Sequence, residues 1–146
     1  MTRGFFGIGI EHTKTEMNVG TLWRSANILG ASFIFTIGKR YRRQPSDTME
    51  SWRHIPLYNY ATFDDFQKSI PFDTLLVGVE LDAQARPIKQ YTHPDRAIYL
   101  LGAEDHGLSE TALQRCQQII VLPGERSMNV AVAGSIVMFD RVQKSA

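Results

Sequence analysis

Two side chains that can bind a polar ligand, Ser127 and Asn129, lie where the pattern of the chain suits a binding loop. The apolar residues 119–122 are followed by Pro123 and Gly124, which break the chain into a turn. Ser and Asn are favoured N-cap residues, so we predict that a helix begins near them. A strand end, a polar turn and a helix N-terminus together can hold a small polar ligand. The same pattern fits a core helix with an ordinary cap, and it does not decide between the two.

Three further side chains have types that suit chemistry on a polar substrate. Asn18 and Arg24 lie in the segment NVGTLWR, and Glu104 lies in LGAEDHGLS. A guanidinium can stabilise negative charge that develops on oxygen, but its pKa above about 12 makes it a costly general base. Glu104 could pair with Arg24, and a helix would bring Asn18 and Arg24 to roughly one side. Each residue also has an ordinary interpretation: a helix cap, a surface arginine and an exposed loop carboxylate.

The elements that must position these residues alternate between strands and helices. Short apolar runs predict strands at 4–10, 32–37, 56–60, 74–81, 97–101 and 119–122. Helical spacing and cap residues predict helices at 19–29, from Thr62, at 109–116 and after Asn129. This order indicates an α/β fold, with a mostly parallel sheet of about six strands and helices on both faces. Ligands bind beyond the carboxyl ends of such strands, where segments 79–82, 102–108 and 122–129 lie.

Length and composition fit one globular domain, residues 1–146. Hydrophobic residues make up 43% and charged residues 21% of the chain, which suits a full apolar core. No apolar run approaches the roughly 20 residues needed to span a bilayer, and the N-terminal run is too short for a signal peptide. The single cysteine, Cys116, excludes internal disulfides and suits a reducing compartment. We therefore expect a cytoplasmic protein that contacts no membrane.

Positive charge gathers in the N-terminal part of the chain. Residues 1–54 hold eight Lys and Arg against four Asp and Glu, a net +4, whereas residues 55–146 hold eight against eleven, a net −3. The densest positive run is Lys39, Arg40, Arg42 and Arg43, with Arg53 further on. Such a cluster can bind the phosphates of a nucleic acid, and it can equally be a solvated loop. Charge alone leaves the two interpretations even.

Several common functional motifs are absent from the sequence. No G-x-G-x-x-G follows the first predicted strand and no G-x-x-x-x-G-K-[ST] occurs, so the fingerprints of dinucleotide binding and of P-loop phosphate binding are missing. The four histidines are scattered without zinc spacing, and there is no G-x-S-x-G nucleophile elbow. These absences argue against zinc chemistry and against an α/β-hydrolase.

Three motifs stand in order along the chain. They are N-x-G-x-x-x-R at 18–24, G-x-E-x-x-G-L at 102–108, and S-[LM]-N-[VL] at 127–130. Together they resemble the SpoU/TrmH class of the SPOUT RNA methyltransferases, over nearly the whole chain. The resemblance implies an α/β fold with a trefoil knot in its C-terminal third, a homodimer, and methyl transfer from S-adenosylmethionine to a ribose 2′-hydroxyl of RNA. The compact form, without an added RNA-binding domain, looks like the tRNA-modifying members, with rRNA as the alternative substrate.

The resemblance also implies roles for single residues. Cofactor binding falls to three loops, through Val79, Gly102, Glu104, Leu122, Ser127, Met128 and Asn129. Catalysis falls to Arg24, together with Asn18, Glu104, Ser127 and Asn129. We expect RNA phosphates at Arg40, Arg42, Arg43 and Arg53. No metal is expected, because the sulfonium of the cofactor is already activated.

Small departures and two competing hypotheses accompany this resemblance. Ala131 and Ala133 replace residues that are often polar in relatives, and Asp105 with His106 gives the second motif an unusual middle. One competing hypothesis is a non-catalytic RNA-binding or assembly protein on the same fold. The other, a small-molecule methyltransferase, is disfavoured by the basic segment 39–53.

The helix expected after Asn129 has a thin face of small residues. Small and apolar residues recur there at helical spacing: Val130, Ala133, Gly134 and Val137. A thin face lets another helix come close, so we expect Ala131, Gly134 and Ser135 to contact the first helix, with Trp23, across a two-fold axis. This arrangement predicts an obligate dimer.

Overall fold

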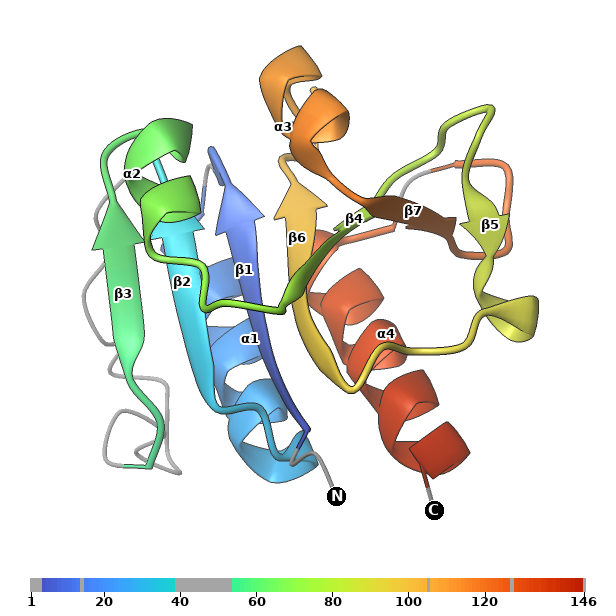
Figure 1. Ribbon diagram of the computed structural model, residues 1–146, viewed down its shortest axis with the longest axis horizontal. Helices are drawn as coiled ribbons and strands as arrows, with labels where there is room; N and C mark the ends of the chain where they lie inside the picture. The colour runs from blue at the N-terminus through green and yellow to red at the C-terminus, as the bar shows by residue number, and fades with distance from the viewer. Residues whose placement is uncertain (1–3, 14, 39–53, 105, 127, 146) are drawn as a thin grey trace.

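The computed structural model describes residues 4–13, 15–38, 54–104, 106–126 and 128–145, which form one seven-stranded sheet covered by helices (Figure 1). Along the chain the strands are β1 (Phe5–Glu11), β2 (Phe33–Ile37), β3 (Leu57–Tyr60), β4 (Leu75–Val79), β5 (Arg86–Pro87), β6 (Arg96–Gly102) and β7 (Gln118–Val121). Their order across the sheet is β3-β2-β1-β6-β4-β7-β5, and each pairing of neighbouring strands is parallel. The predicted α/β fold with a parallel sheet is confirmed.

The sheet of the described residues has seven strands, so the prediction of about six was wrong by one. The unpredicted strand is β5, two residues that pair with β7 at the edge of the sheet. Arg86 and Pro87 are both exposed and carry no apolar pattern. A proline has no N–H to donate, which suits an edge strand. So short and polar a strand leaves no periodic signal in a sequence.

The helices of the described residues are α1 (Glu16–Leu29), α2 (Phe63–Lys68), α3 (Glu110–Arg115) and α4 (Val130–Ser145), with a 3₁₀ turn, η2, at Ile88–Gln90. As predicted, the side chains of Thr62 and Ser109 cap α2 and α3, and α1 ends at Gly30, whose φ of 89° is left-handed. α1 and α4 lie side by side on one face of the sheet, and α2 and α3 lie on the other (Figure 1). Within the described ranges, no helix is both long and apolar enough to cross a bilayer.

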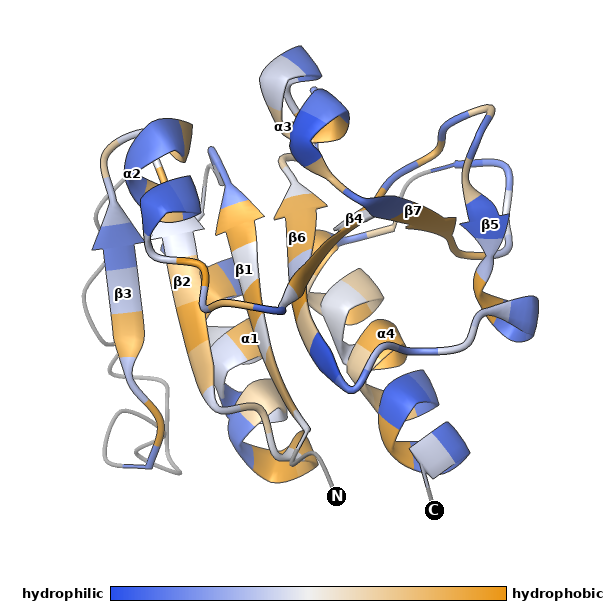
Figure 2. Ribbon diagram, in the orientation of Figure 1, coloured by the Kyte–Doolittle hydropathy of each residue, from blue (hydrophilic) through white to orange (hydrophobic). Residues whose placement is uncertain are grey.

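The central strands β1, β2, β4 and β6 are buried on both faces, which gives the described part of the protein two apolar cores. On the face of α1 and α4, Tyr99 and Leu101 belong to one cluster; on the face of α2 and α3, Ile98 and Leu100 belong to the other. Successive residues of β6 thus serve opposite faces, as strand geometry requires. Figure 2 shows hydrophobic residues concentrated in β1, β2 and β6, in the middle of the sheet.

The small residues of α4 let this helix lie close to α1 within one chain. A side chain at Gly134 would collide with Leu22 of α1, and the hydroxyls of Ser135 and Ser25 lie 2.8 Å apart. Trp23 is buried, and so is Ala131. The expectation that this face contacts a second chain was therefore wrong, because α1 of the same chain already covers it.

A polar network fastens the C-terminal half of α4 to β6. The Arg141 guanidinium donates to Tyr99 Oη (3.1 Å) and to the Asp95 carbonyl (2.9 Å). Tyr99 Oη lies 2.6 Å from His93 Nδ1, and His93 Nε2 lies 2.7 Å from Asp140 Oδ2. Burial raises the pKa of Tyr99, so its hydroxyl keeps its proton and donates to the imidazole. Burial lowers the pKa of His93, and a neutral ring that donates from Nε2 satisfies both contacts.

This network predicts that the folded state loses stability on mild acidification. The pKa of folded His93 lies below its ordinary value of 6.5, so the unfolded chain binds more protons as the pH falls through 6.5. The lowered pKa of Asp140 acts in the same direction at lower pH. The free energy of unfolding, measured by urea titration, should decrease from about pH 7 to about pH 5. His93→Gln should flatten this decrease, whereas the same change at exposed His54 should leave it in place. If the free energy of unfolding of His93→Gln fell with pH as steeply as that of the wild type, the network would be contradicted.

Candidate functional site

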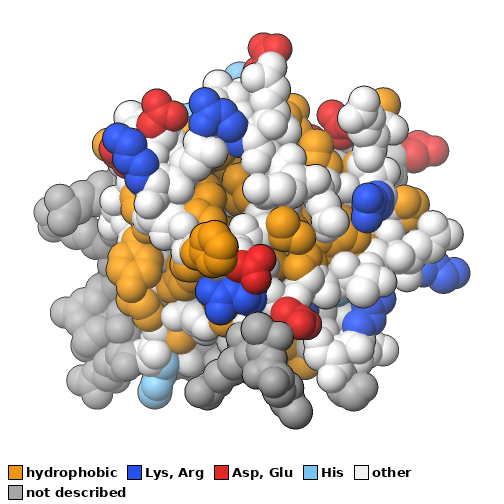
Figure 3. All heavy atoms as spheres, in the orientation of Figure 1, with side chains coloured by type: hydrophobic (Ala, Val, Ile, Leu, Met, Phe, Trp, Pro, Cys, Tyr) orange, Lys and Arg blue, Asp and Glu red, His pale blue; other side chains and the backbone are white. Residues whose placement is uncertain are grey.

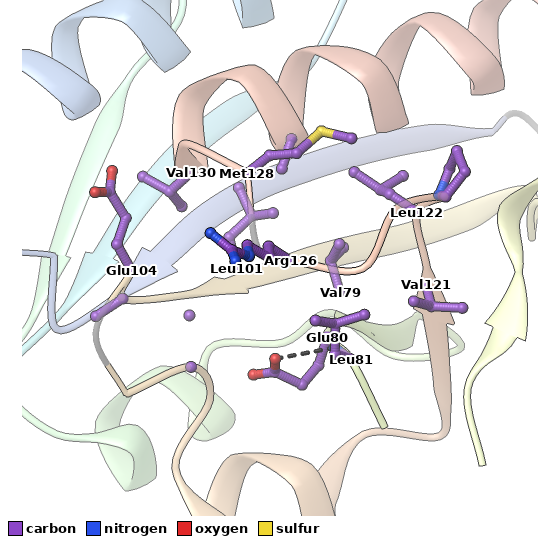
Figure 4. Close-up of a pocket in the computed structure, with 15 residues that line it drawn as sticks. Val79, Glu80, Leu81, Leu101, Glu104, Val121, Leu122, Arg126, Met128 and Val130 are labelled. Atoms are coloured by element: carbon purple, nitrogen blue, oxygen red, sulfur yellow. Dashed lines mark hydrogen bonds between the residues drawn. The ribbon is translucent and has the colours of Figure 1, made fainter. Parts of the chain in front are cut away.

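Three loops, which follow β4, β6 and β7, surround an open hollow of about 550 Å³ (Figure 4). The hollow lies at the carboxyl edge of the sheet and is open to solvent. β6, β4 and β7 are neighbours in the sheet, so their carboxyl ends and the following loops meet there. Five residues expected to bind a cofactor line it: Val79, Gly102, Glu104, Leu122 and Met128.

The walls of the hollow are apolar and its rim is polar. Figure 4 shows Met128 and Val130 on one side, Leu81 opposite them, and Leu122 at one end. The charged residues of the lining are Glu80, Glu104 and Arg126. A side chain at Gly102 would collide with the backbone of the turn at 107–108, so bare backbone lines the hollow there.

Glu104 joins two asparagines from distant parts of the chain. Its Oε1 accepts hydrogen bonds from Asn18 Nδ2 (3.0 Å) and from Asn129 Nδ2 (3.1 Å), and Asn129 Nδ2 also donates to Asn18 Oδ1 (3.0 Å). Hydrogen bonds to an ionised acceptor are stronger than neutral ones. The Asn18–Glu104–Asn129 cluster takes one residue from each of the three sequence motifs, and it lies beside the hollow that Glu104 lines.

Asn129 has a second role as the N-cap residue of α4. Its Oδ1 accepts hydrogen bonds from the backbone N–H groups of Ala131 (2.9 Å) and Val132 (3.2 Å). The amide oxygen therefore fixes the start of the helix, while the amide nitrogen faces Glu104. The interpretation of Asn129 as a helix cap is confirmed, and its role in ligand binding stays a prediction. Asn18 lies inside the first turn of α1, whose N-cap residue is Thr15, so Asn18 does not cap that helix.

Arg24 lies on the exposed side of α1. Six residues of an α-helix turn through about 600°, which leaves Asn18 and Arg24 about 120° apart around the axis and about 9 Å apart along it. The expectation that the two share one side was therefore wrong. Among the described residues, Glu104 bonds to Asn18 and Asn129, so its expected pairing with Arg24 is not formed there.

Two carboxylates that no sequence motif pointed to hold the loop at 102–109. Glu11, the last residue of β1, accepts hydrogen bonds from the backbone N–H and the hydroxyl of Ser109, each with a donor–acceptor distance of 2.7 Å. Glu80, directly after β4, accepts from the N–H groups of Leu108 (2.7 Å) and Leu81 (3.0 Å). Both are single acidic residues at the carboxyl end of an apolar strand, and this position was the signal that could have found them.

Five expected site residues lie outside the described part of the chain: Ser127, Arg40, Arg42, Arg43 and Arg53. Among the residues that are described, no group of three His, Cys, Asp or Glu gathers as metal ligands would. Burial raises the pKa of Cys116 to about 12, so this thiol stays neutral and is a poor nucleophile.

A model of the SpoU rRNA Methylase family matches residues 6–139. The chain belongs to this family. It is 28% identical over 137 residues to mouse tRNA (guanosine(18)-2′-O)-methyltransferase TARBP1. It is 32% identical over 143 residues to the 23S rRNA (guanosine-2′-O-)-methyltransferase RlmB of Acinetobacter baylyi. The alignments cover 84% and 91% of this chain but only 8% and 57% of the two relatives.

The fold is also that of a solved member of the family. The SpoU methyltransferase AviRb from Streptomyces viridochromogenes, crystallised with AdoMet, superposes with a TM-score of 0.89. The match covers 99% of this chain and 59% of that chain at 19% sequence identity, so it shows the common fold. The resemblance inferred from the three motifs is confirmed at the level of family and fold.

The cluster predicts that Asn18 and Asn129 are energetically coupled. Asn18→Ala and Asn129→Ala should each lower the free energy of unfolding, the second by about 1 kcal/mol more because it also removes the cap of α4. The double variant should lose less than the sum, with a coupling of about 0.5–1.5 kcal/mol, because the two side chains bond to each other and share Glu104. Urea denaturation of the four proteins measures this coupling, with Asn129→Ser as the control that keeps a cap. Strictly additive losses would contradict the cluster.

Proposed function

We propose that the chain is an S-adenosylmethionine-dependent methyltransferase that acts on a ribose 2′-hydroxyl of RNA. The joint position of the hollow and the Asn18–Glu104–Asn129 cluster carries this proposal. The names of TARBP1, a tRNA methyltransferase, and of RlmB, an rRNA methyltransferase, support it. We favour tRNA and keep rRNA as the alternative substrate. The chain spans only part of both relatives, so their substrates enter here as hypotheses.

The residues of the hollow fit this cofactor. Adenine is flat and largely apolar, and Leu101, Leu122 and Met128 offer walls of the kind that bind such rings. The bare backbone at Gly102 lets a ligand approach main-chain hydrogen-bonding groups. Val79, at the end of β4, completes the set that would hold it. When bound, S-adenosylmethionine supplies a methyl group that its sulfonium has already activated, and AviRb was crystallised with that cofactor.

The cluster is suited to hold the ribose. Both asparagine bonds fall on Glu104 Oε1, so among the bonds of the described residues Oε2 is open to a substrate hydroxyl. Because the asparagines hold the carboxylate, its position is set before the substrate binds. A 2′-hydroxyl that donates to Oε2 would be oriented for attack and helped to lose its proton. We assign this contact to Glu104, with Asn18 and Asn129 as positioning residues.

A shared apolar stripe on the outer faces of α1 and α4 supports a homodimer. On α4 the stripe consists of residues 36–58% exposed: Val132, Ile136, Phe139 and Val142. On α1 it includes Met17 (73% exposed) and Ile28 (61% exposed), at spacings that place Arg24 on the same side. Exposed apolar patches of this kind mark interfaces. We therefore place the dimer contact on these outer faces, in place of the small-residue face that α1 covers.

The dimer gives Arg24 a role in the site of the other chain. The stripe begins at the N-termini of α1 and α4, where Asn18 and Asn129 meet Glu104. In a two-fold contact through these faces, each Arg24 would approach the partner's cluster. There a guanidinium would bind an RNA phosphate and stabilise charge that develops on the ribose oxygen. Arg24 thus stays our catalytic candidate, acting across the interface.

RNA binding by the basic segment stays a proposal supported by charge. Residues 1–54 carry a net +4. On the face that Figure 3 shows, the described Lys and Arg side chains are dispersed among acidic and hydrophobic ones, so they form no dense basic patch there. We therefore keep the assignment of RNA phosphates to Arg40, Arg42, Arg43 and Arg53, which lie outside the described residues.

Three further expectations are kept as proposals. We infer that residues 1–146 form one methyltransferase domain, which the family match over residues 6–139 supports. We infer a trefoil knot in the C-terminal third, supported by the way the segment 122–130 returns to line the hollow beside the loops after β4 and β6. A cytoplasmic location rests on the single cysteine.

Methyl-labelled S-adenosylmethionine tests the function directly. The purified chain should transfer label to tRNA or rRNA, and alkaline hydrolysis should leave the label in dinucleotides, because a methylated 2′-oxygen cannot attack the neighbouring phosphate. Glu104→Ala should reduce transfer by about 100-fold or more, whereas Glu110→Gln, on exposed α3, should have no effect. RNA binding without transfer would favour the non-catalytic alternative, and label in a base would contradict the ribose assignment.

Mixed dimers test the place of Arg24. Arg24→Ala and Glu104→Ala should each be nearly inactive, and Arg24→Lys should fail too because lysine lacks the planar fork of donors. A mixture of the two alanine variants should recover about a quarter of wild-type activity, since half of the dimers are mixed and each has one site with both residues. Light scattering should give about twice the 16.5 kDa chain mass, and Phe139→Glu should give monomers. Dimers without recovery would contradict the role across the interface.

A further inference from the structure

Glu80 is a charged residue of the hollow to which the proposed reaction gives no role. It is half-buried and faces the hollow beside Leu81 (Figure 4). Its two oxygens accept the hydrogen bonds from the backbone of Leu108 and Leu81, which is the bonding of an ionised carboxylate. The turn above it has Gly107 at φ 65°, and a side chain there would collide with the Glu80 carboxylate. The fold thus makes room for a negative group in an otherwise apolar wall.

The described residues around the hollow carry a net negative charge. Among them, Glu80 and Glu104 line the hollow, against one lining cation, the exposed Arg126. Glu11 adds a buried negative charge behind the same loop, through its bonds to Ser109. Within the described part of the chain, neither Glu80 nor Glu11 forms an ion pair with Lys or Arg. The remaining walls are apolar, so this charge acts on a ligand inside the hollow, while the open rim lets salt screen it in part.

The proposed reaction changes the charge of the cofactor. The bond between sulfur and the methyl carbon would break with its electron pair left on sulfur. The methyl carbon would bond to the ribose oxygen, and the hydroxyl proton would pass to the Glu104 carboxylate and then to solvent. The sulfonium of S-adenosylmethionine becomes the neutral thioether of S-adenosylhomocysteine. Substrate and product forms of the cofactor therefore differ by one positive charge.

We propose that Glu80 selects the cofactor by charge, so that the hollow prefers S-adenosylmethionine and releases S-adenosylhomocysteine. This inference rests on the proposed function. Glu80 lines the hollow, so its carboxylate lies within roughly one Debye length, about 8 Å, of a sulfonium bound there and acts on it. One charge at such a distance changes the ratio of the two affinities by about tenfold. The hydrogen bond to Leu108, by contrast, supports the loop and affects both forms equally.

Calorimetry with three ligands separates the two effects. The ligands are S-adenosylmethionine, S-adenosylhomocysteine and sinefungin, in which a protonated amine on carbon replaces the methylated sulfonium. The wild-type chain should bind both cations more tightly than the neutral thioether, and Glu80→Gln should lose about tenfold of this preference. Asp82→Asn, the same charge change two residues further on and outside the lining of the hollow, should keep it. Glu80→Asp should bind all three ligands more weakly, through the lost bond to Leu108, and also keep the preference.

The outcomes distinguish this inference from the proposed function. An equal weakening of all three ligands in Glu80→Gln would show that Glu80 only supports the loop, and would overturn selection by charge. A wild-type chain that binds none of the three would instead overturn the proposed cofactor. The same preference can be measured without a substitution, because it should shrink as salt is raised. A wild-type preference that does not change with salt would also overturn selection by charge.

Discussion

Two hydrogen bonds on one carboxylate oxygen bring the motifs of this chain together. Glu104 Oε1 accepts from Asn18, 86 positions away in the sequence, and from Asn129, 25 positions away. Asn18 lies in the first turn of α1 and Asn129 caps α4, so two helix N-termini approach the same carboxylate. The partial positive charges of both helix ends stabilise an anion at this point. Glu104 is thus held by neutral amides and helix dipoles, which leaves its charge available to a substrate.

The rest of the fold serves to keep that meeting point in place. The parallel order β1-β6-β4-β7 puts the loops that follow these strands at one edge. Glu11 and Glu80 then hold the loop of Glu104 from below, each through backbone N–H groups. On the other side, Gly134 lets α4 pack closely on α1, so that the two helix N-termini lie near enough to share one acceptor. Glu11, Glu80 and Glu104 give this edge of the sheet a negative charge, which suits a cationic ligand.

The sequence predicted those elements of the structure that have a periodic apolar pattern or a characteristic helix-cap residue. Apolar runs predicted six of the strands, and Thr62 and Ser109 predicted two helix starts. The family resemblance implied five of the residues that line the hollow. Side-chain acceptors of backbone N–H groups, such as Glu11 and Glu80, leave no periodic pattern, so they were not found. The spacing of Asn18 and Arg24 along the chain does not by itself fix their directions, because an α-helix rotates by about 100° at each residue.

The sequence also left undecided which segments pack against α4 and β5. A face of small residues on α4 predicts a close neighbour, but it does not say whether the neighbour belongs to the same chain. The same limit applies to β5, whose pairing with β7 depends on the strands already placed beside it. Such features follow from the assembled sheet and have no local cause in the residues themselves.

A crystal structure of the chain with sinefungin would test most directly whether the hollow and the cluster form one site. The account predicts the adenine ring between Leu101, Leu122 and Met128, with the bonds of Asn18 and Asn129 to Glu104 retained. The amine that replaces the methylated sulfonium should lie between Glu80 and Glu104. A ligand bound in the open cleft beside Cys116 and Gln117, or a cluster that comes apart when the hollow fills, would contradict it.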